Sequence, residues 1–536
     1  MSGHSLRARR PRREHSATVE IGRDPDVLRS FLEDAAHFPG GHASGIATPA
    51  TETDVAAVLR SAATVLAIGA QSSLSGGATP MGEVLLGTSR LNRIVEIGED
   101  AVRVQAGVRL VDLDTALALA GKYYPPAPTF AGAFVGGVIA TNAAGAATFK
   151  YGTTRDWVRA ITIVLPGGDV LEVERGATTA DREGRFEIVL QDRIARVEIP
   201  SYRMPRVPKV SAGYFASPGM DLIDLFIGSE GTLGVITEAT LRVVRVRPAM
   251  CLAFVPFNDR RAALAVVTRL REAARDTWRR RDPAGLDVSA IEHMDARSLA
   301  LLREDGADRR FGVAIPAEAA IALLVTLELA PETTAADAFD EIGRAREQGA
   351  PDTRLTRFCR VLDEAGVLDA VEIAVPGDDA RAAQLLALRE EVPAAVNARV
   401  GRAKQTIDPR IAKTAADMIV PFESLEALLM MYDGEFRRRG LDAAVWGHIS
   451  DGNLHPNVIP RSIADVESGK EAILAFGREV IRLGGSPLAE HGVGRHPIKQ
   501  QLLEDMYGRG GIAQMRAVKR ALDPEWKLAP GVLFPV

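Results

Sequence analysis

Two histidines seven residues apart are the feature whose residue types point most directly to chemistry. Residues 446–457 read WGHISDGNLHPN and contain His448 and His455. Asp451 and Gly452 between them favour a tight turn, so the pattern predicts a hairpin that brings both imidazoles to one place. Neutral imidazole is a common ligand of zinc-like metals, and two imidazoles need a third donor to complete a site.

A later segment offers such a donor. Residues 489–492 read AEHG, and they add the carboxylate of Glu490 and the imidazole of His491. Histidines in a chain of this length are usually satisfied by ordinary hydrogen bonds. The spacing alone therefore leaves the structural and the metal-binding interpretations both open.

The composition is that of a globular protein with more than one domain. The chain has 536 residues, of which 46% are hydrophobic and 25% are charged, and its net charge is -5. This length exceeds one ordinary hydrophobic core, so two or more domains are expected. The charge is spread without a dominant run, which argues against a nucleic-acid partner and leaves small organic substrates.

Cysteine usage and hydropathy bear on the location of the protein. Cys251 and Cys359 stand outside any CxxC pattern, which argues against a disulfide framework or an iron–sulfur cluster and favours a reducing compartment. Residues 1–22 are rich in arginine and precede no apolar stretch, so they are interpreted as a disordered basic tail, with a transit peptide as the alternative. No run approaches the ~20 apolar residues of a membrane span. A cytoplasmic protein without a transmembrane segment is expected, and peripheral membrane association stays open.

An α/β pattern begins near residue 45, and its helices and strands must position the loops that could bind a ligand. Residues 52–62 predict an amphipathic helix capped by Thr51, and residues 65–68 predict a buried strand. The loop from Gly69 to Gly77 is rich in glycine and serine, and successive backbone N–H groups in such a loop suit an anion. A merely flexible turn is the alternative for this loop.

Two more glycine-rich blocks follow at residues 125–156 and 221–237. The abundance of Gly, Ala and Thr in the first block indicates a backbone that approaches something flat or bulky, with tight helix packing as the alternative. Residues 174–207 are polar and fit no clear pattern. From residue 250 to 440, helical periods alternate with strand candidates, which predicts an α+β domain built on an antiparallel sheet.

The order of the motifs resembles one flavoprotein family. The chain contains GxxxSLSGG, PPxPT, GGxxATNAAG, YGTTRD, LFIGSEGTLGVITE, GHxxDGNLH and EHGVG, in that order. This series resembles the FAD-dependent 2-hydroxy-acid dehydrogenases of the vanillyl-alcohol-oxidase superfamily, in particular the D-lactate, glycolate-oxidase-subunit and D-2-hydroxyglutarate dehydrogenase groups. The resemblance runs from about residue 45 to the C-terminus. It implies an α+β protein with a two-lobed FAD-binding domain of the vanillyl-alcohol-oxidase type and an α+β cap domain.

The resemblance also implies a division of the chain and a cofactor. The expected parts are the tail 1–22, the FAD-binding domain 23–246, the substrate or cap domain 247–485, and the EHG and C-terminal segment 486–536, which returns to the FAD domain. FAD is expected to bind non-covalently, because the first loop holds no histidine or cysteine as a tether. The residues expected to bind it are Ile68, Gly69, Ala70, Gln71, Ser72, Ser73, Leu74, Ser75, Gly77, Pro128, Thr129, Gly136, Gly137, Thr141, Asn142, Gly145, Tyr151, Gly152, Gly234, Val235 and Ile236.

The family pattern further assigns the chemistry. It makes His448, His455 and Glu490 ligands of a divalent metal, with zinc favoured over manganese or iron, and His491 the base. The metal would lower the pKa of the substrate hydroxyl, His491 would take its proton, and the C2 hydrogen would leave as hydride to flavin N5. Neighbours in a strand point to opposite faces, so Glu490 and His491 require a strand end or a turn, which Gly492 favours.

Two more residues receive roles from the resemblance. Arg389 resembles the arginine that pairs with the substrate carboxylate, with a helix-surface salt bridge as the alternative. Asn453 is expected to contact the hydroxyl or a metal-bound water, with a turn-stabilising amide as the alternative. The chain departs from the family pattern at Pro393, Lys413 and residues 528–532, which leaves the size of the substrate open.

The expected function is oxidation of a D-2-hydroxy acid, such as lactate or 2-hydroxyglutarate, to the 2-oxo acid. A flavin transferase resembling alkyl-dihydroxyacetone-phosphate synthase is one alternative. A non-catalytic flavin subunit of an electron-transfer complex is the other, and the histidines with Glu490 argue against it. Electrons are expected to leave through a separate acceptor, which is a quinone, a soluble carrier or an iron–sulfur subunit. The oligomeric state is open, with a homodimer as one outcome.

Overall fold

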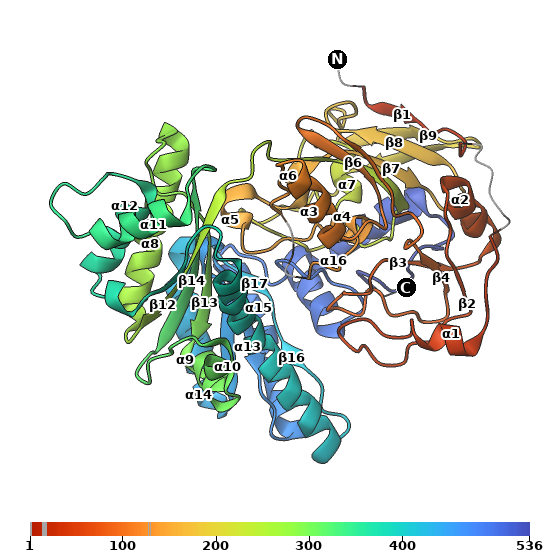
Figure 1. Cartoon of the computed structure of the whole chain (residues 1–536). Helices are drawn as coiled ribbons and strands as arrows, with labels where there is room; N and C mark the ends of the chain where they lie inside the picture. The colour runs from red at the N-terminus through yellow and green to blue at the C-terminus, as the bar shows by residue number, and fades with distance from the viewer. Residues whose placement is uncertain (1–2, 13–18, 127, 129, 536) are drawn as a thin grey trace. The chain divides into compact units, whose positions relative to one another are not determined.

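The computed structural model describes residues 3–12, 19–126, 128 and 130–535 (Figure 1). The chain divides into two compact units. The first unit comprises Met1–Gly145, Gly152–Arg245 and Leu488–Val536, and the second comprises Ala146–Tyr151 and Val246–Pro487. The predicted domains break at 246/247 and 485/486, close to these crossings, but they lack the short excursion of residues 146–151 into the second unit.

A small parallel sheet forms around the first predicted strand. Its order is β2 (Gly45–Ala47), β4 (Val84–Gly87) and β3 (Val65–Ile68). Helix α2 (Glu52–Ser61) packs its apolar residues into the same core. Thr51 caps this helix, and a reciprocal capping box satisfies its first N–H groups, so the helix and strand predictions are confirmed.

The second sheet of this unit is antiparallel and places the two later glycine-rich blocks. Alternate side chains such as Val102 and Val104 are buried, as the period-two pattern predicts. Helix α4 (Val135–Ala140), from the second block, packs on this sheet. The strand order is β5 (Ile94–Ile97), β6 (Ala101–Gln105), β11 (Val235–Arg242), β7 (Val158–Val164) and β8 (Val170–Glu174).

The expectation of a disordered tail over residues 1–22 is wrong for its first described part. Strand β1 (Ser5–Arg7) pairs with β9 (Arg185–Val189), which pairs with β10 (Ile194–Glu198). The arginines also find acidic partners, since Arg9 Nη1 lies 2.7 Å from Glu52 Oε1. The unassigned segment 174–207 thus supplies a hairpin that orders the basic residues. Residues 13–18 lie outside the described part of the chain.

The second unit is built on one antiparallel sheet, as predicted. Both faces of its long strands are buried, as expected for a sheet with helices on both sides. The strand order is β15 (Glu372–Ala374), β12 (Ala249–Phe257), β14 (Ile321–Leu329), β13 (Val288–Asp295), β18 (Ala443–His448), β19 (Asn453–Val458) and β16 (Thr414–Ala415), and β17 (Met418–Ile419) also pairs with β19.

The helices of the second unit cover both faces of this sheet, and β12, β13 and β14 run side by side in Figure 1. One core joins α9 and α13 to alternate strand residues such as Phe254 and Leu324. The other alternate residues are also buried, and α8 and α12 contact the same strands. The helices of this unit are α5 (Thr148–Tyr151), α8 (Arg260–Arg280), α9 (Ala296–Glu304), α10 (Ala307–Phe311), α11 (Ala335–Arg344), α12 (Arg354–Glu364), α13 (Asp379–Thr406), α14 (Leu425–Arg439) and α15 (Ile463–Arg482).

The remaining helices belong to the first unit. A search of the described residues finds no helix with both the length and the apolar character to cross a membrane. Cys251 on β12 and Cys359 on α12 are buried free thiols, and burial raises the pKa of each. The helices of the first unit, besides α2 and α4, are α1 (Pro25–Arg29), α3 (Leu110–Leu119), α6 (Thr154–Trp157), α7 (Ile223–Phe226) and α16 (Pro497–Leu522).

Candidate functional site

The hairpin predicted from the two histidines is present in the second unit. Strand β18 ends at His448, a short turn follows at Ile449–Asp451, and β19 begins at Asn453. His455 lies opposite Trp446 on the neighbouring strand. The two imidazole rings stand 5.5 Å apart and nearly perpendicular. Both are almost fully buried, so the hairpin brings two ligand candidates together inside the protein.

Two glycines make this close geometry feasible. Gly452 adopts a φ of 86°, and a Cβ at this position would lie 2.4 Å from the carbonyl oxygen of Val420. At Gly447, a Cβ would lie 2.7 Å from the carbonyl oxygen of Asn453. Any larger residue would push the hairpin away from the neighbouring backbone. The sequence signal of Asp451 before glycine therefore has a steric basis in the fold.

A buried carboxylate accompanies each histidine. His448 Nδ1 lies 3.0 Å from Glu292 Oε2, and His455 Nδ1 lies 3.4 Å from Asp417 Oδ1. A carboxylate beside Nδ1 favours the tautomer with its proton there, which leaves the Nε2 lone pair for a ligand. The sequence reasoning missed both acids. The available signal for Glu292 is an acidic residue directly after the apolar residues Ala290 and Ile291 within a strand, VSAIEHMD.

Glu292 also contacts the predicted substrate-binding arginine. Arg389 on α13 donates from Nη2 to Glu292 Oε2 over 3.0 Å, and Arg389 is only 8% exposed. The partner is on β13, so the alternative of a helix-surface salt bridge is wrong. Burial opposes ionisation of Glu292, but the charges of Arg389 and His448 dominate and lower its pKa to about 2. Arg389 Nε has no acceptor among the residues that the structure describes.

Asn453 is oriented by the same set of groups. Its Nδ2 donates to Asp417 Oδ1 over 2.8 Å and to the carbonyl oxygen of Met418 over 3.0 Å. These two bonds use both N–H groups and fix the direction of the amide. Its Oδ1 is buried and accepts no hydrogen bond from the described part of the chain. Asn453 therefore presents an open acceptor beside the histidines.

Glu490 and His491 lie in the first unit, at a bend rather than within a strand. Gly492 and Gly494 follow with φ values of 69° and 58°, as the predicted turn requires. Both oxygens of Glu230 accept backbone N–H groups of residues 493 and 494 at 2.8 Å, which fixes this segment. The fully buried ammonium of Lys209 forms an ion pair with Glu490, a partner that the sequence reasoning missed.

Most of the predicted FAD-binding residues line one cavity of about 310 Å³ in the first unit. Glu490 and His491 line the same cavity. The wall also includes Phe134, Phe226 and Glu230, which were not among the residues expected to bind FAD, although Phe226 and Glu230 belong to the motif LFIGSEGTLGVITE. The predicted residues in the wall are Ile68, Gly69, Ala70, Gln71, Ser72, Ser73, Leu74, Gly77, Pro128, Gly136, Gly137, Thr141, Gly234, Val235 and Ile236.

The glycines of this wall have different reasons to be glycine. A Cβ at Gly136 would lie 2.7 Å from Ala106 Cβ, and a Cβ at Gly234 would lie 2.4 Å from Ile163 Cγ2, so protein packing explains both. A Cβ at Gly137 would meet no described atom within 4 Å. Gly137 therefore presents bare backbone to the cavity, as a wall that receives a flat ring requires.

Other predicted FAD-binding residues do not line this cavity. Gly152 is needed by its own turn, because a Cβ there would lie 2.3 Å from Asp156 Oδ2. Tyr151 belongs to the second unit, where its hydroxyl donates to Glu328 Oε2 over 2.7 Å. Thr129 lies outside the described residues. The described residues that were expected to bind FAD but do not line the cavity are Ser75, Asn142, Gly145, Tyr151 and Gly152.

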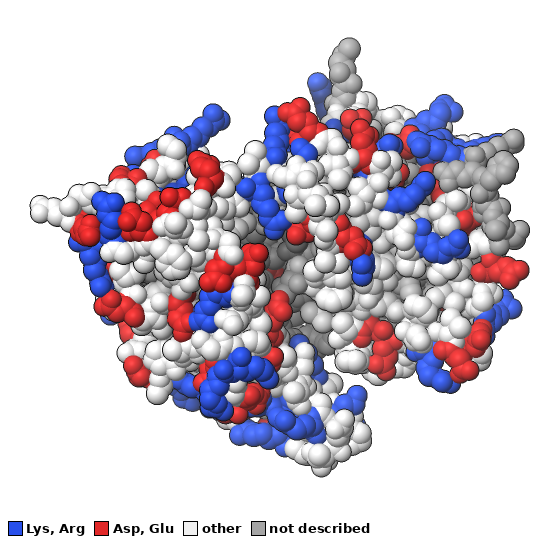
Figure 2. Space-filling model, viewed as in Figure 1, with Lys and Arg blue, Asp and Glu red and all other residues white. Residues whose placement is uncertain are grey.

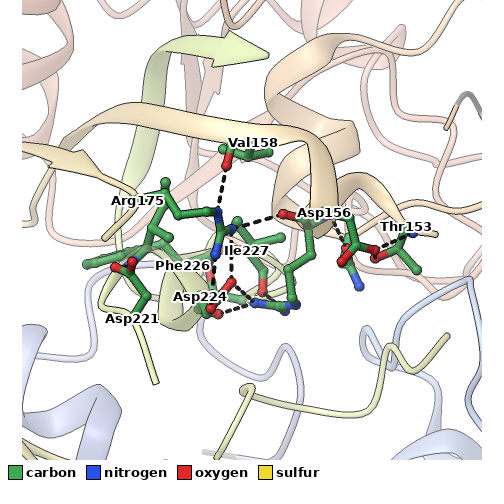
Figure 3. A network of polar contacts seen from close by, with 12 residues as sticks. Thr153, Asp156, Val158, Arg175, Asp221, Asp224, Phe226 and Ile227 are labelled. Atoms are coloured by element: carbon green, nitrogen blue, oxygen red, sulfur yellow. Dashed lines mark hydrogen bonds and ion pairs between the residues drawn. The ribbon is translucent and has the colours of Figure 1, made fainter. Parts of the chain in front are cut away.

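A partly buried ion network adjoins the segment that carries Phe226 and Glu230 of the cavity wall (Figure 3). Asp224 on α7 accepts hydrogen bonds from both Arg155, at 3.0 Å, and Arg175, at 3.1 Å. Arg155 Nη2 also donates to the carbonyl oxygen of Ile227 over 2.6 Å. Burial lowers the pKa of Arg155, although Asp224 opposes this effect. The network connects Arg155, at the end of the glycine-rich block 125–156, to the segment that carries Phe226 and Glu230.

Comparisons with known proteins agree with this arrangement. Residues 43–174 match the family described as FAD binding domain, and residues 257–533 match FAD linked oxidases, C-terminal domain. The chain is 31% identical to a D-2-hydroxyglutarate dehydrogenase of Xanthomonas citri pv. viticola, covering 91% of this chain and 89% of that protein. A D-lactate dehydrogenase of Anaerostipes hadrus is 27% identical, with 94% and 93% covered.

A solved alkyldihydroxyacetonephosphate synthase shares the fold, with a TM-score of 0.59 and 14% identity over 98% of this chain and 89% of that one. The two matched families together span both structural units. The chain belongs to the FAD-linked oxidases. It is an FAD-dependent oxidoreductase of the vanillyl-alcohol-oxidase type, and the fold and family expected from motif order are confirmed.

Proposed function

We propose that this oxidoreductase converts a D-2-hydroxy acid into the 2-oxo acid. The observation that carries the proposal is the buried set in the second unit, where two histidines, an arginine and the amide nitrogen of Asn453 contact the carboxylates of Glu292 and Asp417. Two relatives of this chain are named for D-2-hydroxyglutarate and D-lactate. The substrate class needs a carboxylate partner and a hydroxyl partner, and this set contains both.

FAD is the cofactor that the first unit fits. The glycine- and serine-rich loop of residues 69–77 and the open backbone at Gly137 would hold it non-covalently in the cavity. When bound, FAD supplies the acceptor for the hydride. Phe134 and Phe226 add apolar surface to the wall, which would reduce the contact of the flavin with water.

The imidazoles of the hairpin fit a divalent metal, with zinc preferred over manganese or iron. His448 and His455 are buried, and the carboxylates at Nδ1 leave Nε2 of each ring as the ligand. When bound, such a metal acts as a Lewis acid that lowers the pKa of the substrate hydroxyl. Glu490 and His491 lie in the first unit, so their roles as third ligand and base stay predictions.

Arg389 and Asn453 would orient the substrate. The guanidinium of Arg389 keeps a buried Nε–H without an acceptor among the described residues, and a carboxylate oxygen satisfies it. Asn453 Oδ1 would accept a hydrogen bond from the hydroxyl or from a metal-bound water. As the base, His491 would take the hydroxyl proton on a ring nitrogen.

The charge of the protein also favours a small-molecule substrate. Basic and acidic side chains lie beside one another on the face shown in Figure 2. Together with the net charge of -5, this mixture supports a small-molecule substrate in preference to nucleic acid. The separate electron acceptor, the cytoplasmic location and the oligomeric state stay predictions.

An anaerobic screen of D- and L-2-hydroxy acids tests the proposal. The purified yellow protein should lose its flavin absorbance with a D-2-hydroxy acid, and removal of the metal by a chelator should slow this bleaching. A transferase of the alkyl-dihydroxyacetone-phosphate type or a passive flavin subunit would not be bleached by any of these acids. Absence of bleaching across the screen would therefore refute the proposed activity, and bleaching that ignores the chelator would refute its metal.

A further inference from the structure

We infer that Glu292 is a positioning residue that uses one carboxylate oxygen to set both His448 and Arg389. The inference rests on the proposed function, because it concerns the metal ligand and the carboxylate-binding residue named there. No motif of the chain marks Glu292, and its placement follows from strand pairing. Glu292 thereby links the proposed metal ligand His448 to the proposed substrate-binding residue Arg389, although the two are far apart in sequence.

The backbone fixes Glu292 beside His448. Strands β13 and β18 pair antiparallel, and Glu292 lies directly opposite His448 in their register. Directly opposite residues of an antiparallel pair project on the same face with Cβ atoms about 4.5–5.5 Å apart. The neighbouring His293 lies opposite Gly447 and projects to the other face. A slip of one residue would replace the carboxylate by an imidazole, so the register selects the acid.

A single oxygen then serves two partners. Glu292 Oε2 lies 3.0 Å from His448 Nδ1 and 3.0 Å from Arg389 Nη2. The contact with the ring favours a proton on Nδ1 and an open lone pair on Nε2. The contact with the guanidinium fixes the plane of the fork and leaves Nε for the substrate. Loss of this oxygen would therefore disturb two groups together.

The second carboxylate beside the hairpin contacts groups of a different kind. Asp417 Oδ1 lies 3.4 Å from His455 Nδ1 and accepts from Asn453 Nδ2 over 2.8 Å. It orients a metal ligand and an amide, whereas Glu292 joins a metal ligand to a buried cation. The Glu292 contact therefore couples the proposed metal to the charge that would bind the substrate carboxylate.

The test compares Glu292→Ala and Glu292→Gln with wild type in the full-length FAD-loaded protein. Glu292→Ala should lower the affinity for zinc about 10- to 100-fold and should raise KM for the hydroxy acid more than it lowers kcat. Glu292→Gln keeps an acceptor oxygen and should restore part of both. The matched control is Glu372→Ala, which removes an ion pair between β15 of the same sheet and Arg381 of α13 and should leave zinc affinity and KM unchanged.

The tautomer of His448 gives a readout that does not depend on turnover. In metal-free wild-type protein labelled with ¹⁵N-histidine, the signal lost in His448→Gln should show the proton on Nδ1, and Glu292→Ala should shift it toward Nε2. A wild-type proton on Nε2 would overturn the inference even in an active enzyme. Failure of the wild type to bind zinc or to be bleached would instead refute the proposed function. If Glu292→Ala fails to fold, unchanged zinc affinity and KM in Glu292→Gln overturn the inference.

Discussion

The cavity of the first unit and the hairpin of the second unit are built from different kinds of groups. The cavity wall uses loops, backbone and small residues, and its residues cluster in three glycine-rich blocks along the chain. The hairpin uses charged side chains that lie far apart in sequence. They are Glu292 on β13, Arg389 on α13 and Asp417, which directly precedes β17. Short sequence blocks therefore encode most of the cavity wall, whereas the pairing of distant segments assembles the charged groups of the hairpin.

This difference separates two kinds of failure. A change at the hairpin should remove chemistry and leave the cofactor, because the hairpin residues belong to the second unit and the glycine wall to the first. A change at the wall should remove the cofactor and leave the imidazole pair. Variants that lose both at once would show that the two regions do not act independently.

His455→Ala should produce the largest effect. The change removes one of two adjacent imidazoles and leaves Asp417 without its ring partner. Loss of Lewis-acid assistance should lower kcat/KM about a thousandfold, which equals about 4 kcal/mol of transition-state stabilisation. Bound zinc measured by elemental analysis should fall, while flavin absorbance stays at the wild-type level. Full activity with the zinc content of the wild type would contradict the assignment of His455.

The sequence predicted the local elements well, because their signals are local. Thr51 caps the helix where its spacing indicates, residues 65–68 form a buried strand, and Gly452 forms the turn of the hairpin. Motif order then indicated the family and the fold. The fold could be predicted this far because capping, period-two burial and glycine turns depend on a few neighbouring residues.

The remaining features depend on pairing between distant segments. Glu292 lies opposite His448 only after β13 and β18 adopt their register, and Asp417 reaches His455 from a separate segment. The basic tail looked disordered because its pairing partner β9 lies in the polar segment that fits no pattern. The buried Lys209 likewise acquires its partner Glu490 by folding alone. Composition cannot indicate which distant charge will neutralise another.

Asp295 is a second carboxylate of β13 that bonds to strand β18 of the hairpin. It accepts the backbone N–H of Val445 over 3.0 Å, and burial raises its pKa from 3.8 to about 6. A raised pKa of an acid means that wild-type stability declines as pH rises from about 4 to about 6, by about 3 kcal/mol at most. Asp295→Asn cannot ionise, so its stability relative to wild type should improve over this pH window.

Urea unfolding of both proteins at pH 4 and pH 7 measures this difference. The asparagine keeps one acceptor oxygen, so it can retain the bond from Ser298 or the bond from Val445 but not both. This loss is the same at both pH values, so the pH-dependent part of the difference reports the ionisation of Asp295. Equal shifts at both pH values would show that Asp295 is not a buried acid with a raised pKa. Zinc affinity at pH 7 serves as the control and should stay unchanged, because Asp295 contacts neither histidine in the described structure.

Two adjacent glycines give the smallest and most discriminating comparison. Gly136→Ala places a Cβ 2.7 Å from Ala106 Cβ, so overpacking should lower the free energy of unfolding by about 1–3 kcal/mol. The Cβ of Gly137→Leu would meet no described atom within 4 Å, and the change should leave the stability of the flavin-free protein unchanged or slightly higher, since helix α4 loses a glycine. The leucine should nevertheless enter the cavity and lower the flavin content of the purified protein. Thermal unfolding and flavin absorbance of both variants separate packing from binding, and a Gly137→Leu protein with full flavin would show that this wall does not receive the ring.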